Sequence, residues 1–96
     1  MSQTGSELDD ETLALTLKTL GDETRYKVLI ELIQPHAKNK DIAKKLGLTR
    51  ASISFHTQKL LNSGLLELVM DDGSVKYTVN KKLIQKIIEK FKQDLK

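Results

Sequence analysis

The chain of 96 residues contains no cysteine, no tryptophan and only one proline. The absence of cysteine excludes disulfides, thiolate metal ligands and a cysteine nucleophile, and it suits the reducing cytoplasm. No run reaches the ~18 apolar residues that a membrane-spanning helix needs, and residues 1–10 lack the basic and apolar regions of a secretory signal. We therefore expect a soluble, cytoplasmic protein with room for one domain only.

The residues that catalysis usually requires are also scarce. The two histidines, His36 and His56, stand in different predicted elements, and there is no glycine-rich phosphate loop. No acidic pair lies inside the apolar pattern, where burial would tune its pKa. His36, beside Pro35, is typical of a loop rather than of a catalytic base. We do not expect an enzyme.

Charge is distributed unevenly, although the formal net charge is only +3. Residues 1–24 carry six acidic side chains and a single lysine, whereas residues 38–59 carry six basic side chains and one aspartate. Residues 81–96 again carry six lysines, against one glutamate and one aspartate. This asymmetry indicates an anionic partner. The alternative is that the lysines are simply solvated helix residues.

Apolar spacing predicts a mainly α-helical chain with a small β-hairpin, in the order α-α-α-α-β-β-α. Residues 1–8 are polar and small and are expected to form a disordered leader, which leaves one domain at residues 9–96. The hairpin strands are LLELVM at 65–70 and SVKYTV at 74–79, with residues 71–74 as a tight turn. A last amphipathic helix completes the chain.

Stop and cap signals separate the first two helices. From Asp10, Leu13, Leu17 and Leu20 recur on one helical face, and Gly21 is expected to end this helix in a left-handed conformation. Asp22 is a cap for the second helix, which must end before Pro35. The core stripe of the second helix is predicted to comprise Val28, Leu29, Leu32 and Ile33.

Two helices joined by a short turn with a glycine occupy the centre of the chain. The first runs from Lys40 to Leu46, Gly47-Leu48 forms the turn, and the second runs over 49–62 with Thr49 as its cap. Such a pair is a helix-turn-helix, whose second helix reads the DNA major groove, and a hairpin directly after it makes a winged helix. On this helix the core face is Ile53, Thr57, Leu60 and Leu61, and the opposite face is Ser52, Phe55, Lys59 and Asn62, with His56 at the flank.

These segments resemble the ArsR-type (arsenic repressor-like) regulators of bacteria and archaea. The stretch LKTLGDETRYKVLIELI is similar to the second-helix signature of that family, and DIAKKLGLTRASISFHTQKLLNSGLLE is similar to its helix-turn-helix. The matching positions are Leu20, Asp22, Thr24, Arg25, Val28 and Leu29 in the signature, Ser52, Ser54 and His56 in the motif, and Gly73, Tyr77 and Val79 in the wing. The resemblance implies a homodimeric, prokaryotic DNA-binding regulator of transcription.

The chain also departs from the family pattern. The best-known metal sensors of the family carry Cys-x-Cys at the start of the first motif helix, or Asp and His pairs on the last helix. This chain has HAKNKDIA at the first place and neither Cys nor His at the second, so we expect no metal, no cofactor and no identifiable effector. Phe55 stands where a polar or basic residue is more common, and Thr57 where Leu is common, which points to a different DNA preference.

Several side chains are candidates for DNA contact. Thr49 is suited to a phosphate, Ser52 and His56 to a base edge, and Phe55 to a thymine methyl group. Arg50 and Lys59 are long enough for a phosphate or a guanine, and Lys38, Lys44 and Lys76 are further phosphate candidates. Alternatively, His56 packs at the helix flank, Phe55 is covered by the wing or a partner, and each lysine is merely solvated. Arg25 is expected to be structural, pairing with Glu31 or Asp22.

The first and last helices provide more apolar surface than the remaining elements can cover. We therefore expect a homodimer, whose interface comprises Leu13, Leu15, Leu17, Leu83, Ile84, Ile87, Ile88 and Phe91. The alternative is that the last helix folds back over its own core. The last helix is Lys-rich and amphipathic, but Phe91 is its only aromatic residue, which disfavours a membrane surface.

The function predicted from the sequence is sequence-specific DNA binding by a transcriptional repressor. Residues 49–62 would lie in the major groove of a palindromic operator, and the 71–74 turn would be the wing tip. Repression is favoured over activation because occupying a promoter requires no further surface. The alternative is a winged-helix module that contacts protein or RNA without sequence-specific DNA binding.

Overall fold

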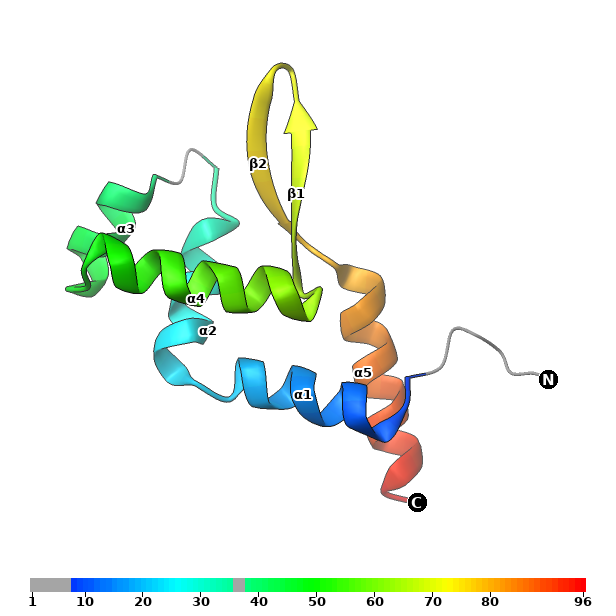
Figure 1. The fold of residues 1–96 in the computed structure, drawn as a ribbon. Coiled ribbons are helices and arrows are strands. Elements are labelled where there is room, and N and C mark those ends of the chain that lie inside the picture. Colours follow the sequence, from blue (N-terminus) through cyan, green and yellow to red (C-terminus); the bar gives the residue numbers. More distant parts are fainter. Residues whose placement is uncertain (1–7, 36–37) are drawn as a thin grey trace.

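The structure is a computed structural model that describes residues 8–35 and 38–96 (Figure 1). Five helices and one hairpin follow each other in the predicted order, so the winged helix-turn-helix fold is confirmed. The expected leader lies outside the described residues except Leu8, which packs against the core, and His36 also lies outside them. The elements are α1 (Asp10–Leu20), α2 (Glu23–Leu32), α3 (Asn39–Leu46), α4 (Arg50–Ser63), β1 (Leu66–Asp71), β2 (Ser74–Val79) and α5 (Lys81–Asp94).

The core forms where α4 contacts the first three helices and the base of the hairpin. Ile53 and Leu60 of α4 and Val28 of α2 are completely buried. A fully buried side chain of this size contributes roughly 1.5–3 kcal/mol. The buried apolar set is Leu13, Val28, Leu29, Leu32, Ile42, Ala43, Ile53, Leu60, Leu65, Leu66 and Ile87.

The buried face of α1 differs from the predicted leucine stripe. Leu17 is 42% exposed, whereas Thr16 and Thr19 are buried. Their hydroxyls donate to the carbonyl oxygens of Thr12 (2.7 Å) and Leu15 (2.9 Å), one turn earlier, which removes the cost of burying them. The expectation for Gly21 was also wrong, because its φ of −73° is right-handed. The chain passes directly from Gly21 to the cap of α2 and needs no left-handed residue there.

A left-handed glycine does occur in the turn between α3 and α4. Gly47 has a φ of 68°, and the next N–H, that of Leu48, donates to the carbonyl of Ala43 at 2.9 Å. Reversal of the chain at this point sends α4 back across α3, with which it is in contact. Thr49 then caps α4 as predicted, its hydroxyl accepting from the N–H of Ser52 at 3.0 Å.

The hairpin forms an arm that projects away from the helices (Figure 1). Asp72 and Gly73, with φ of 54° and 81°, make the two-residue turn of positive φ that suits the twist of a hairpin. Cross-strand partners share one face of the ribbon. One face is therefore apolar throughout, with the pairs Leu66–Val79, Leu68–Tyr77 and Met70–Val75.

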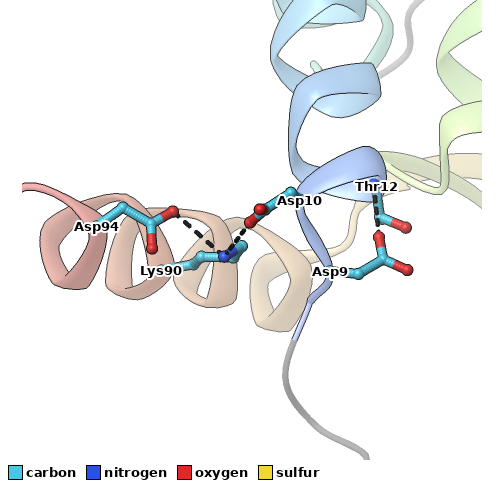
Figure 2. Close-up of polar contacts among 5 residues, drawn as sticks. All are labelled: Asp9, Asp10, Thr12, Lys90 and Asp94. Carbon is cyan, nitrogen blue, oxygen red and sulfur yellow. Dashed lines mark hydrogen bonds and ion pairs between the residues drawn. The ribbon is translucent and has the colours of Figure 1, made fainter.

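The C-terminal helix is joined to α1 by an ionic clamp (Figure 2). The Nζ of Lys90, whose side chain is only 18% exposed, lies 2.7 Å from Asp10 and 3.2 Å from Asp94. Hydrogen bonds to these two carboxylates raise the pKa of Lys90 above its ordinary value of 10.5. Beside the clamp, Asp9 caps α1 by accepting from the N–H of Thr12 at 2.7 Å, and hydrogen bonding to the side chain and backbone of Thr12 lowers the pKa of Asp9.

Replacement of Lys90 by Gln should lower the melting temperature at pH 7, because it removes the ammonium that joins α1 to α5. Since the folded-state pKa of Lys90 is raised, its contribution is present below pH 10.5 and is lost as the pH rises through the folded value. The difference between wild type and Lys90→Gln should therefore close at alkaline pH. Lys92→Gln, at an exposed position of the same helix, is the control, and an equal loss in both variants would contradict the clamp.

Candidate nucleic-acid interface

The outer face of α4 carries the side chains predicted to contact DNA. Arg50 and Lys59 are exposed, Ser52 is half-buried, and Phe55 is 55% exposed. The described part of the wing therefore does not cover Phe55. The ammonium of Lys59 lies 5.5 Å from the centre of the Phe55 ring, a cation–π geometry worth roughly 0.5–1 kcal/mol at an exposed site. This face presents cations, a hydroxyl and an aromatic ring together.

The N-terminus of α4 is suited to an anion. Its first turn holds no acidic residue, and Arg50 occupies the first helical position after the Thr49 cap. Because the helix dipole places partial positive charge at this end, a phosphate oxygen would be attracted to the backbone N–H groups and to Arg50. The cap uses one N–H, that of Ser52, and so also holds the first turn in shape.

His56 occupies the flank of this face and is held by a residue of α2. Its Nδ1 accepts a hydrogen bond from Nε of Arg25 at 3.3 Å, and a terminal N–H of Arg25 donates to the carbonyl of Thr19 at 3.1 Å. The rings of His56 and Phe55 meet edge to face, with centroids 5.4 Å apart. Arg25 thus connects the last turn of α1 to α4.

The expected partners of Arg25 were wrong. Glu31 instead pairs with Lys45, at 2.8 Å. Asp22 accepts from the backbone N–H of Arg25, at 2.9 Å, rather than from its guanidinium. That hydrogen bond, and secondarily the nearby charge of Arg25, lower the pKa of Asp22. The contact between Arg25 and His56 was missed because nothing in the sequence marks a pair 31 residues apart.

The lysines proposed for phosphate contact lie in different surroundings. Lys38, at the start of α3, and Lys44, in its last turn, are both exposed. Lys76 on the wing instead pairs with Asp71 at 2.8 Å, and this bond lowers the pKa of Asp71. Residues 66–79 carry three carboxylates, those of Glu67, Asp71 and Asp72, and only this one lysine. The wing tip is therefore acidic, which opposes close approach to phosphates.

The residues predicted for the dimer interface fall into two groups. Leu13 and Ile87 are 8% and 6% exposed in the core of the protomer, and Leu83 and Ile84 are half-buried and pack against that core. The remaining four are all more than 40% exposed: Leu15, Leu17, Ile88 and Phe91. They lie on α1 and α5, the two helices that Lys90 joins.

Two other kinds of feature are absent from the part of the chain that the structure describes. No group of three or more His, Cys, Asp or Glu side chains within it is placed to hold a metal ion. None of its helices is both long enough and apolar enough to cross a membrane.

Comparison with known proteins agrees with this geometry. Residues 21–67 match the family described as winged helix-turn-helix DNA-binding. An uncharacterised protein of Methanocaldococcus jannaschii is 38% identical over 77 residues, which cover 75% of this chain and 28% of that protein. The HTH-type transcriptional regulator CmtR of Mycobacterium tuberculosis is 30% identical over 73 residues, covering 76% of this chain and 62% of CmtR. The chain thus spans less than two thirds of either relative.

Solved structures show the same fold. An ArsR-like transcriptional regulator from a Rhodococcus species superposes with a TM-score of 0.72 and 26% identity, covering 86% of this chain and 78% of that one. The homodimeric winged helix-turn-helix domain of a possible ArsR-family regulator from Mycobacterium bovis superposes with a TM-score of 0.60 and 20% identity, covering 98% and 91%. The chain therefore has the winged helix-turn-helix fold, and its resemblance to the ArsR-type regulators is confirmed.

Proposed function

We propose that this protein is a transcriptional repressor that binds a palindromic operator as a homodimer. The observation that carries the proposal is the outer face of α4, where Arg50 and Lys59 are exposed beside Phe55. A helix of 14 residues is roughly 21 Å long and fits the major groove, where these groups meet base edges and phosphates. Repression follows from occupation of the promoter alone.

The neighbouring elements divide the phosphate contacts between them. Lys38, the residue just before α3, and Lys44 on α3 are exposed, and they belong to the part of a helix-turn-helix that meets the DNA backbone. Lys76 pairs with Asp71 and is the weaker candidate. We therefore assign the main electrostatic contribution to α3 and α4, with the 71–74 wing tip at the edge of the interface.

Palindromic recognition requires two copies with their reading helices about one DNA turn, ~34 Å, apart. The exposed leucines of α1 and the exposed Ile88 and Phe91 of α5 supply apolar surface for this pairing. The solved Mycobacterium bovis domain, which has the same fold, is homodimeric. Both observations support a dimer through α1 and α5.

One observation favours the alternative, a winged-helix module that contacts another protein. The apolar face of the wing is exposed toward its tip, with Leu68, Met70 and Val75 at 52%, 72% and 59%. Exposed apolar surface on a soluble domain commonly marks a binding site. A wing of this composition suits a protein surface better than a phosphate backbone.

Selection from a random duplex pool tests the two functions directly. A repressor should enrich a palindrome and prefer it over a scrambled duplex by ~10³ or more at one fixed salt concentration. Ser52→Ala should reduce that preference by about tenfold, because it removes a base-edge donor and acceptor. Lys27→Ala, on α2 in an exposed pair with Glu23, should leave it unchanged. Failure to enrich any site would overturn the repressor and favour the protein-binding module.

Removal of the α4 cap should weaken both folding and DNA binding. Thr49→Ala loses the bond to the Ser52 N–H and is expected to cost about 1 kcal/mol in the free energy of unfolding. Thr49→Ser keeps the hydroxyl and should behave like wild type in urea denaturation and in operator affinity. Equal stability of the Ala and Ser variants would show that the cap contributes nothing.

A charge within the exposed apolar surface should separate the dimer. Ile88→Lys places an ammonium where the proposed interface would bury it, and burial of an unpaired charge is costly. Sedimentation equilibrium at tens of micromolar should show a dimer for wild type and a monomer for Ile88→Lys. Gln85→Lys, at an exposed position of the same helix, adds the same charge and is the control. A monomeric wild type would remove the dimer from the proposal.

A further inference from the structure

The link between Arg25 and His56 joins three helices, α1, α2 and α4. It lies beside the outer face of α4, which is the proposed DNA-reading face. Arg25 is half-buried, donates to the Thr19 carbonyl at 3.1 Å, and donates through Nε to Nδ1 of His56 at 3.3 Å. An arginine fixed at two points has little freedom to rotate. The imidazole of His56 is therefore held at Nδ1 by the guanidinium of Arg25, which belongs to α2 rather than to α4.

The chemistry of this link determines which nitrogen of His56 carries the proton. A guanidinium only donates hydrogen bonds and stays charged at every relevant pH, so Nδ1 must offer its lone pair. In a neutral imidazole the single proton then resides on Nε2. His56 consequently presents an N–H donor at Nε2. Its one acceptor nitrogen, Nδ1, is already used by Arg25.

A carboxylate and an aromatic ring lie next to this link. The Asp22 carboxylate accepts from the backbone N–H of Arg25 at 2.9 Å, and this hydrogen bond, with the charge of the nearby guanidinium, lowers its pKa. The edge of the His56 ring rests near Phe55, with centroids 5.4 Å apart. In the described part of the chain Nε2 forms no protein hydrogen bond, while His56 stays half-buried on the flank of the reading face.

We propose that Arg25 is a specificity-determining positioning residue: it holds His56 as the Nε2–H tautomer, which then selects a base with an acceptor in the major groove. Such acceptors are purine N7, guanine O6 and thymine O4, whereas the amino groups of adenine and cytosine repel a donor. The inference rests on the proposed DNA binding. Arg25 touches no DNA in this scheme and acts only through His56.

The first experiment examines the free protein and requires no operator. Nitrogen-15 NMR of labelled histidine at neutral pH should show His56 with a protonated Nε2 and an acceptor Nδ1. The Arg25 Nε–H signal should be resolved. It should shift in His56→Gln, because the amide of Gln lies at the level of Nε2 and leaves no acceptor at the Nδ1 position. A proton on Nδ1, or an Arg25 signal indifferent to His56→Gln, would overturn the proposal whatever the protein binds.

The second experiment uses DNA. Arg25→Met keeps an unbranched side chain but loses both donors, and it should reduce discrimination at one base pair of each half-site by about tenfold. Its affinity for a scrambled duplex should not change, because phosphate contacts remain. A purely structural role would instead lower the melting temperature and weaken binding to all sequences equally, which would overturn the assignment.

The two experiments fail independently. If wild type enriches no DNA site, the repressor proposal falls, and with it the reading role of His56, although NMR still reports the tautomer. If Arg25→Met does not fold, the NMR result on wild type decides whether Arg25 holds the ring. If wild type binds an operator and Arg25→Met retains the same base preference, His56 reads without Arg25 and the inference is wrong.

Discussion

Burial of one face of α4 determines the orientation of the reading surface. Ile53 and Leu60 are completely buried, and Thr57 joins them because its hydroxyl donates to the Ile53 carbonyl at 2.7 Å. A helix pinned by three residues on one side has no freedom to roll about its axis, so Phe55 and Lys59 must face outward. The exposed face requires no stabilising contacts of its own. Its residues are therefore free to serve the proposed contact with DNA.

The second constraint is that α4 is positioned from both ends. At its start, Gly47 in the left-handed conformation and the Thr49 cap set where the helix begins. At its end, Gly64, with a φ of 83°, breaks the helix, and Leu65 and Leu66 bury the base of the hairpin. A change in the hydrophobic core would thus move the reading face and the wing together. Arg25 adds a polar connection to the same helix from the side of α2.

Local signals in the sequence were sufficient to predict the order of the elements and the fold. They were not sufficient to predict the side-chain contacts between elements. The caps Asp22 and Thr49 and the Asp72-Gly73 turn were predictable because each depends on residues within one turn of the chain. The buried face of α1 was not predictable, because a pattern of leucines does not reveal that Thr16 and Thr19 can be buried. Their hydroxyls donate to backbone carbonyls of the same helix. The inward position of Leu13 and Ile87 likewise depends on which helices pack together. Arg25 and His56, the most informative pair of the site, meet only after the fold is complete.

The distribution of charge on the folded protein differs between the helices and the wing. The exposed lysines of α3 and the cations of α4 lie on consecutive helices, whereas the wing tip carries Asp71 and Asp72 and an apolar face. A phosphate backbone that follows α3 and α4 would meet repulsion from the carboxylates at the tip of the wing. Attraction at one end of the module and repulsion at the other favour an orientation in which α4 enters the groove while the wing tip stays off the backbone. In the proposed complex the helix-turn-helix would supply the affinity, and the apolar face of the wing would be left accessible at its edge.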